Sequence, residues 1–152
     1  MQSSTKIPSI LAGVAGEYYV AAELSRRGYI ASVSLKNTRG IDILATNQDG
    51  TRSITIQVKT NQLAKREWVL NCKAEDFVAD NHYYIFVSLS GQLSRPNFYI
   101  VPSLEVANQI TQGHAEWLRT PGRNGRMHVD NKMRKFIDQE NDYLEKWDTL
   151  NL

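Results

Sequence analysis

The sequence has a single cysteine, Cys72, among its 152 residues, and it has no long apolar run. One cysteine cannot form an intrachain disulfide or a thiolate zinc cage, so disulfide scaffolds and zinc ribbons are excluded. No segment approaches the roughly 18 to 20 apolar residues that a membrane span requires, and residues 1–8 lack the apolar core of a signal peptide. We therefore expect a cytoplasmic protein that binds no membrane.

Charge of one sign is also scarce, because 18 Lys and Arg face 16 Asp and Glu, for a net charge of +2. This excess is too small to indicate a nucleic-acid partner, so any such partner must be argued from local placement. Internal repeats and low-complexity stretches are absent too. At roughly one domain per 150 residues, the length predicts one domain over 1–152, with a core at about 10–113 and a C-terminal loop and helix over 114–152.

The order of apolar patterns predicts an α/β fold. Helical spacing over 10–27 ends at Gly28, where a left-handed cap is expected. Strand patterns and turn residues alternate from there to residue 101, and Pro102 and Ser103 then open another helix. The strands are expected at 29–35, 41–46, 54–59, 68–70, 83–89 and 98–101, and the remaining helices at 74–79, from 103 towards 110, and at about 131–147.

The C-terminal part is electrically split. Residues 114–136 hold six Lys or Arg against two acids, whereas residues 137–148 hold five acids against one Lys. This pattern favours a solvated loop followed by an acidic helix over a dedicated phosphate-binding arm. The apolar residues of that helix fit either the core or a second subunit; they are Met133, Phe136, Ile137, Leu144 and Trp147.

A carboxylate interrupts the apolar face expected for the first helix. If Ile10, Val14, Ala21 and Leu24 point inward, Glu17 lies in the middle of their stripe. A buried carboxylate is costly unless it is paired or near a metal. Alternatively, the helix buries Leu11, Ala15, Tyr18 and Ala22 instead, and Glu17 reaches solvent.

Asp49-Gly50 is a typical hairpin turn, and it predicts how the two strands on either side of it pair. Counting back from a two-residue turn places Asp42 opposite Gln57, and Lys59 lies on the same face. Ile54, Ile56 and Val58 point the other way and supply core. The spacing alone fits a polar outer face as well as it fits a site, since half-buried strands alternate in this way.

Several other sites can be set aside. The three histidines, His82, His114 and His128, are isolated from one another, so no zinc site is expected. The sequence has no phosphate-binding loop of the GxxxxGK type and no GxSxG motif. The aromatic residues of the strand-like runs, Trp68, Tyr83, Tyr84, Phe86, Phe98 and Tyr99, are expected in the core rather than on a base-stacking surface.

The order Glu17, then Gly40-Ile41-Asp42, then Ile56-Gln57-Val58-Lys59, resembles the PD-(D/E)XK superfamily of nucleases, also called restriction-endonuclease-like. The resemblance covers about residues 10–101. Gln57 stands where the family usually has a second acid, and Ile41 replaces the proline that names the motif. The resemblance implies a mixed central sheet of about five strands flanked by helices.

The resemblance also implies an Mg²⁺ site, for which Mn²⁺ is an expected substitute. Asp42 would bind the ion directly, beside the Gln57 side-chain oxygen and the Val58 backbone carbonyl, and Glu17 would reach it through water. Lys59 would orient the attacking water and stabilise charge on the phosphate. Oxygen donors of this kind are those that Mg²⁺ prefers.

The implied function is metal-dependent hydrolysis of nucleic-acid phosphodiester bonds, with DNA as the expected substrate. Lys36, Arg39 and Arg52, which flank the turns near these residues, would contact phosphates. Because Gln57 contributes no charge, the alternative is a catalytically inactive nuclease fold that binds nucleic acid or a protein partner. Relatives of this kind are often dimers, so a homodimer is possible.

Overall fold

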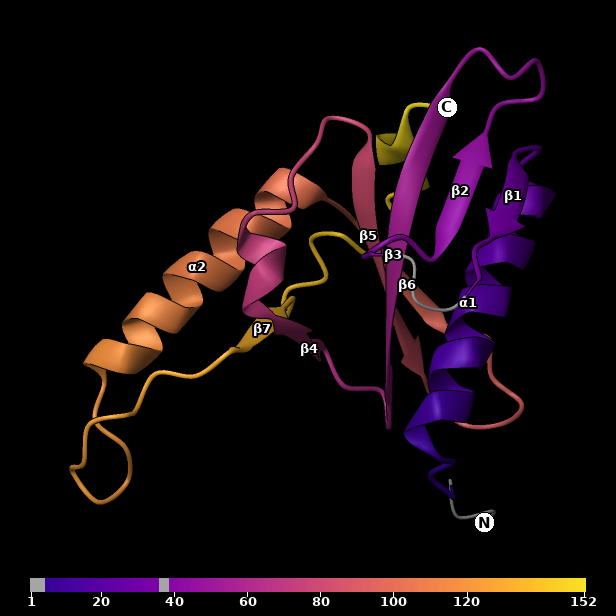
Figure 1. Cartoon of the computed structure of the whole chain (residues 1–152). Helices are drawn as coiled ribbons and strands as arrows, with labels where there is room; N and C mark the ends of the chain where they lie inside the picture. Colours follow the sequence, from indigo (N-terminus) through magenta and orange to yellow (C-terminus); the bar gives the residue numbers. More distant parts are fainter. Residues whose placement is uncertain (1–4, 36–38) are drawn as a thin grey trace.

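The computed structural model describes residues 5–35 and 39–152, and it is an α/β structure (Figure 1). The described chain has two long helices and seven strands. In chain order the elements are α1 (Ser9–Arg26), β1 (Ile30–Val33), β2 (Ile43–Thr46), β3 (Ser53–Gln62), β4 (Glu67–Asn71), the 3₁₀ helix η1 (Cys72–Glu75), β5 (His82–Leu89), β6 (Asn97–Pro102), α2 (Ser103–Arg119), β7 (Met133–Ile137) and the 3₁₀ helix η2 (Trp147–Leu150).

The main sheet has five strands in the order β1-β2-β3-β5-β6. β1, β2 and β3 form an antiparallel meander, β5 pairs with β3 in parallel, and β6 pairs with β5 antiparallel. Strands β4 and β7 form a separate antiparallel pair. The predicted mixed sheet of about five strands is therefore confirmed.

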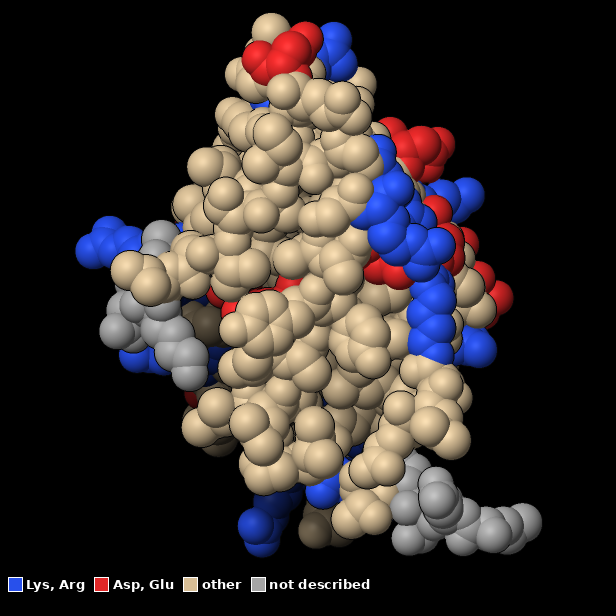
Figure 2. All heavy atoms as spheres, turned by 90° about the vertical axis from the view of Figure 1, so that its right-hand side faces the viewer, with Lys and Arg blue, Asp and Glu red and all other residues tan. Residues whose placement is uncertain are grey.

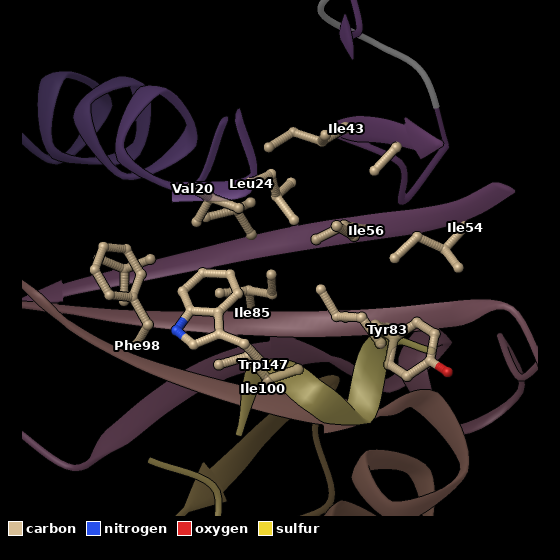
Figure 3. Close-up of a cluster of buried hydrophobic side chains, with 14 residues drawn as sticks. Val20, Leu24, Ile43, Ile54, Ile56, Tyr83, Ile85, Phe98, Ile100 and Trp147 are labelled. Carbon is tan, nitrogen blue, oxygen red and sulfur yellow. The ribbon is translucent and has the colours of Figure 1, made fainter. Parts of the chain in front are cut away.

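Helix α1 and η2 cover one face of the main sheet. Val20 and Leu24 of α1 pack against the even-numbered side chains of β3, such as Ile56, while Trp147 of η2 packs beside Phe98 (Figure 3). Most of these side chains are inaccessible to solvent. This cluster accounts for the strict alternation of apolar residues in β3, since each inward side chain meets α1.

The opposite face carries α2, η1 and the β4–β7 pair. Trp68 of β4 lies against Phe86 and Tyr99 of the main sheet, and its indole N–H donates to the Val87 carbonyl at 3.0 Å. Phe136 of β7 stacks on Phe86 with ring centroids 4.4 Å apart. The aromatic residues of the strands are thus buried, as predicted.

Helix α1 buries neither of the two stripes considered from the sequence. Its buried side faces the sheet with Ala12, Gly16, Val20, Glu23 and Leu24, whereas Ile10 is 73% exposed. Gly16 sets this orientation, because a Cβ at that position would overlap the Thr60 side chain of β3. Small residues let the helix approach the sheet, and hydropathy spacing does not register them.

The buried carboxylate of α1 is Glu23 rather than Glu17. Glu23 pairs with Arg27 at 2.5 Å and with Arg95 at 3.1 Å. Burial opposes ionisation of Glu23, but the hydrogen bonds from Arg95 and Arg27 outweigh it and lower its pKa. Arg95 lies 72 residues away in the sequence, so local pattern gave no sign of this pair.

The outward face of α1 carries few charged groups (Figure 2). Ile10, Leu11, Tyr18 and Tyr19 are all well exposed on it. Within the described ranges, no helix has the length and apolar character needed to cross a membrane.

The helix predicted at 131–147 is wrong, and with it the C-terminal helix expected within 114–152. Residues 133–137 form β7, which pairs with β4 and buries Arg134 and Phe136 on one side. Beyond it the Asp138 carboxylate accepts the backbone N–H groups of Asp142 and Tyr143, which closes a turn. Alternation at period two, rather than helical spacing, was the correct pattern here.

Two further helix predictions need correction. The segment at 74–79 is not helical beyond the short η1, whose first turn is capped by the Asn71 side chain on the Lys73 N–H. Helix α2 continues through Gly113 to Arg119 instead of stopping near residue 110. Gly113 costs helix stability but does not end the helix.

Candidate active site

The β2–β3 ribbon has the predicted register. Ile43 pairs with Ile56 and Thr46 pairs with Ser53, which places Asp42 beside Gln57. The turn differs from the two-residue one expected, because Asn47 N–H donates to the Arg52 carbonyl and leaves a four-residue loop. Both loops centre on Asp49-Gly50, so they give the same pairing.

Asp42 is fixed at the start of β2 by two hydrogen bonds. Its N–H donates to the Ile56 carbonyl at 2.8 Å, and its Oδ2 accepts the Val58 N–H at 2.7 Å. The β2–β3 pairing stops at Ile43, so the main-chain groups of Val58 lie just beyond it. The N–H and C=O of one residue in an extended strand point to the same side, and the Val58 carbonyl therefore lies on the Asp42 side of β3.

The electrostatics of Asp42 favour a nearby cation. Burial raises the pKa of this carboxyl, and the Val58 N–H and the Lys59 ammonium only partly offset the effect. A part-buried carboxylate without a full complement of positive charge gains most from a bound cation.

Gln57 and Lys59 project from β3 into a cavity of about 630 Å³. Its walls come from the loop before β2, the end of β4, η1 and the loop that follows η1. The other lining residues are Arg39, Gly40, Leu70, Asn71, Lys73, Ala74, Asp76, Phe77 and Tyr84. The polar face of β3 and the β4–η1 segment therefore enclose one space.

One edge of this cavity requires a glycine. Gly40 has a φ of +60°, and a Cβ there would lie 3.1 Å from the Phe77 ring and 3.8 Å from the Gln57 Oε1. The left-handed backbone and the short approach both disfavour any larger residue. Gly40 thus lets the loop before β2 close over Gln57.

Tyr84 forms the wall behind Gln57, its direct neighbour in the parallel β3–β5 pairing. Its hydroxyl is buried without a hydrogen-bond partner in the described part of the chain. Burial raises the pKa of Tyr84 to about 12, so the group stays a neutral donor. The sequence had indicated only a core residue, because the β3–β5 register that brings Tyr84 to the cavity is not visible in a local pattern.

The structure does not gather every predicted site residue. Glu17 is half-buried on α1, next to Gly16, and α1 covers the face of β3 opposite to Gln57 and Lys59. Arg52 lies in the hairpin loop and donates to the Asn151 carbonyl at 3.4 Å. Arg52 precedes Gln57 by five positions along the strand, a span of about 16 Å.

Of the predicted phosphate-binding residues, Arg39 lines the cavity, whereas Lys36 lies outside the described residues. Asn71, Lys73 and Phe77 line the cavity as well. They come from β4, η1 and the loop after η1, and sequence periodicity does not show that these segments lie beside β3.

Three oxygen donors come from neighbouring positions of the β2–β3 ribbon: the Asp42 carboxylate, the Gln57 amide oxygen and the Val58 carbonyl. Such hard oxygen donors suit Mg²⁺, and one carboxylate with two neutral oxygens suits a weakly bound ion that keeps several waters. Across residues 5–35 and 39–152, no three His, Cys, Asp or Glu side chains are grouped to hold a metal. The donor set fits one divalent ion whose remaining ligands come from solvent and substrate.

Comparisons with known proteins give a match only at the level of structure. No protein-family model matches the chain, and no curated protein does. A bacterial homing endonuclease, I-Ssp6803I, superposes with a TM-score of 0.55 at 11% identity, over 96% of this chain and 94% of that one. A Holliday junction resolvase of Archaeoglobus fulgidus, Hjc, gives a TM-score of 0.47 at 16% identity, over 83% of this chain and 84% of that one.

The match to the homing endonuclease covers nearly the whole of each chain. The chain therefore has a restriction-endonuclease-like α/β fold.

Proposed function

We propose that this protein is a metal-dependent nuclease that hydrolyses phosphodiester bonds of DNA. The observation that carries the proposal is that Gln57 and Lys59 line one cavity and that the Asp42 carboxylate is bonded to Val58, the residue between them. The Val58 N–H orients Asp42, and Lys59 is near enough to lower the pKa of that carboxyl.

Within this proposal Asp42, the Gln57 side chain and the Val58 carbonyl hold a divalent cation. When bound, Mg²⁺ would neutralise charge on the scissile phosphate and make water a better nucleophile. Lys59 contributes a compact, fixed positive charge for the negative charge that grows on the phosphate oxygens during attack. Arg39 at the cavity edge holds a neighbouring phosphate without reading sequence.

Glu17 has a conditional place in this proposal. Its helix lies on the other face of the sheet, so it acts only from the sheet edge and through water. Asp42 and Lys59 carry the proposed chemistry, and Glu17 adjusts the affinity for the cation.

The experiment that tests the proposal is incubation of the purified protein with supercoiled, linear and four-way-junction DNA. Each substrate is tested with Mg²⁺, with Mn²⁺ and with a chelator. Cation-dependent cleavage of at least one form is expected. No cleavage of any form under any of these conditions would contradict the proposal.

One observation favours a second candidate, a binding or interaction module without catalysis. The β2–β3 ribbon brings one carboxylate, Asp42, to the proposed cation, since Gln57 stands at a position where a second acid would add charge. The carboxylate that lines the cavity, Asp76, comes from the loop after η1 instead. Loss of that charge weakens cation binding. Cation-independent DNA binding without cleavage would distinguish this candidate from the nuclease.

The homodimer expected from the resemblance stays a prediction, and so does the cytoplasmic location. The surface of α1 offers an interface, because Ile10 is 73% and Tyr18 64% exposed on a face with few charges (Figure 2). Sedimentation velocity over a range of concentrations tests it. Tyr18→Asp should shift any dimer to monomer, whereas a wild-type protein that stays monomeric excludes this interface.

A further inference from the structure

A basic arm follows α2 and is not part of the cavity described above. We define the basic arm as residues 119–132, which contain Arg119, Arg123, Arg126 and Lys132, all exposed. Its one acid, Asp130, is hydrogen-bonded to His114. In the described chain no carboxylate lies within 4.0 Å of these four cationic groups. The positive charge of the arm is thus not neutralised within the protein.

Side-chain stacking gives the arm a definite shape. The Trp117 ring of α2 stacks on the His128 ring, with centroids 4.1 Å apart, and on the His114 ring, with centroids 5.4 Å apart. The Gly122 N–H donates to the Arg126 carbonyl at 2.9 Å and closes the tip. This stack lies outside both clusters of core residues, so it orders the arm rather than the fold. Binding to a pre-ordered loop has a lower entropic cost.

The C-terminal end of the arm lies at the rim of the cavity. The Lys132 carbonyl accepts the Cys72 N–H at 2.8 Å, and the residues on either side of Cys72, Asn71 and Lys73, line the cavity. The main chain of Lys132 is therefore bonded to the β4–η1 wall of the cavity, which is also lined by Lys59 and Lys73.

From that rim the arm extends away from the sheet (Figure 1). Gln109 fixes α2 to β7 by two hydrogen bonds with the main chain of Ile137, at 2.8 and 2.9 Å. Arg119 lies ten residues further along α2, about 15 Å at 1.5 Å per residue. This length matches about four or five phosphates along one strand of a duplex at 3.4 Å each.

We infer that the basic arm binds the phosphate backbone of a DNA duplex whose scissile phosphate lies at the cavity. The inference rests on the proposed function for its choice of substrate. Guanidinium groups bind phosphate oxygens in pairs of hydrogen bonds and do so independently of sequence. The arm therefore sets affinity and the length of duplex that is needed, and it takes no part in the chemical step.

The test compares two double variants with the same loss of charge. Arg123→Gln with Arg126→Gln alters the arm, and Lys6→Gln with Lys146→Gln alters exposed cations elsewhere. Binding to fluorescent duplexes is measured by anisotropy without divalent cation, over a series of salt concentrations. A short duplex and one extended by about half a helical turn of 10 base pairs are compared.

The arm variant should bind the longer duplex about tenfold more weakly than wild type at about 0.1 M salt, with a salt slope reduced by about 2. The control variant should stay within about twofold, and Arg123→Lys with Arg126→Lys should restore most of the binding. Cleavage of the short duplex should be the same for wild type and arm variant. Circular dichroism checks that each variant melts as the wild type does.

Equal binding of the long duplex by the arm and control variants would overturn the inference, even if the wild type cleaves DNA. Arm-dependent binding to anionic lipid vesicles but not to DNA would also overturn it, because the partner would then be a membrane surface. A wild type that binds DNA through the arm but never cleaves it would instead overturn the proposed nuclease and leave the arm as a DNA-binding surface.

Discussion

The Asp42 Oδ2 accepts the Val58 N–H at 2.7 Å, and this bond joins the start of β2 to the part of β3 that carries Gln57 and Lys59. The last main-chain pair between β2 and β3 is Ile43 with Ile56. Just beyond it, the Asp42 carboxylate accepts the N–H that a further strand residue would otherwise accept with its carbonyl. A carboxylate in a main-chain position is held rigidly, which is what a cation ligand requires.

Asp42→Asn should stabilise the protein at pH 7 in the absence of metal. Burial raises the pKa of Asp42, so ionisation of this group opposes folding above its ordinary pKa range. The difference between variant and wild type should shrink as the pH falls from the raised pKa of folded Asp42 towards 3.8, and it should vanish below 3.8, where both states are protonated. Urea denaturation at several pH values measures it, and a less stable variant at pH 7 would count against the electrostatic account.

The same variant tests cation binding. Mg²⁺ at ten times its dissociation constant should stabilise the wild type by about 1.4 kcal/mol. Asp42→Asn should lose that gain, because it removes the one carboxylate of the donor set. Thermal melting with a Mg²⁺ titration is the measurement, and equal stabilisation of both proteins would place the cation elsewhere.

Gln57→Glu should strengthen Mg²⁺ binding by about tenfold, since it adds a charged oxygen next to Asp42. Gln92→Glu adds the same charge at an exposed loop position and serves as the control. Isothermal titration calorimetry of the two variants compares their affinities. A similar affinity in both would mean that Gln57 does not face the cation.

Stability should fall between pH 6.5 and about 4 because of His82. This histidine is only 2% exposed, and burial lowers its pKa to about 4. The hydrogen bond with Thr55 raises the pKa, but by less than burial lowers it. The unfolded chain takes up a proton near pH 6.5 and the folded chain does not, so folding loses about 3 kcal/mol over this range. His82→Gln should flatten the pH profile of urea denaturation, and an unchanged profile would assign the loss to other groups.

Gly16 and Gly13 offer a matched pair on α1. A Cβ at Gly16 overlaps Thr60, whereas nothing lies within 4 Å of one at Gly13. Gly16→Ala should cost about 1 to 3 kcal/mol of unfolding free energy. Gly13→Ala should add about 0.5 to 1 kcal/mol through helix propensity. Opposite signs in urea denaturation confirm the packing of α1 on β3, and a neutral Gly16→Ala contradicts it.

The ribbon that carries the site could be predicted because its information is local. The apolar alternation in β3 and the position of Asp49-Gly50 predict the same register between β2 and β3. The two-residue loop expected and the four-residue loop observed share one centre, so Asp42 lies beside Gln57 in both. A strand next to its hairpin partner has few alternative registers once its apolar face is fixed.

The rest depended on partners far away in the chain. β7 is a strand because β4 offers its edge, and Arg134 is tolerated inside because Glu75 pairs with it. Glu23 is buried for the same kind of reason, with Arg95 as its partner. No window of neighbouring residues contains these pairs, so periodicity predicted a helix over 131–147 and gave no sign that Glu23 is the buried acid of α1.

The second wall of the cavity was also beyond local reasoning. Tyr84 reaches it through the parallel pairing of β3 with β5, and Phe77 through the fold of the loop after η1 onto Gly40. Parallel pairings are set by the packing of whole layers rather than by a turn.

The measurement that tests the central claim most directly is cation-dependent cleavage of DNA by wild type, Asp42→Ala and Lys59→Ala, with folding checked by circular dichroism. The wild type should cleave in Mg²⁺ or Mn²⁺, and each variant should lose cleavage by a factor of about 100 or more while staying folded. Cleavage by both variants at the wild-type rate would contradict the assignment of the site.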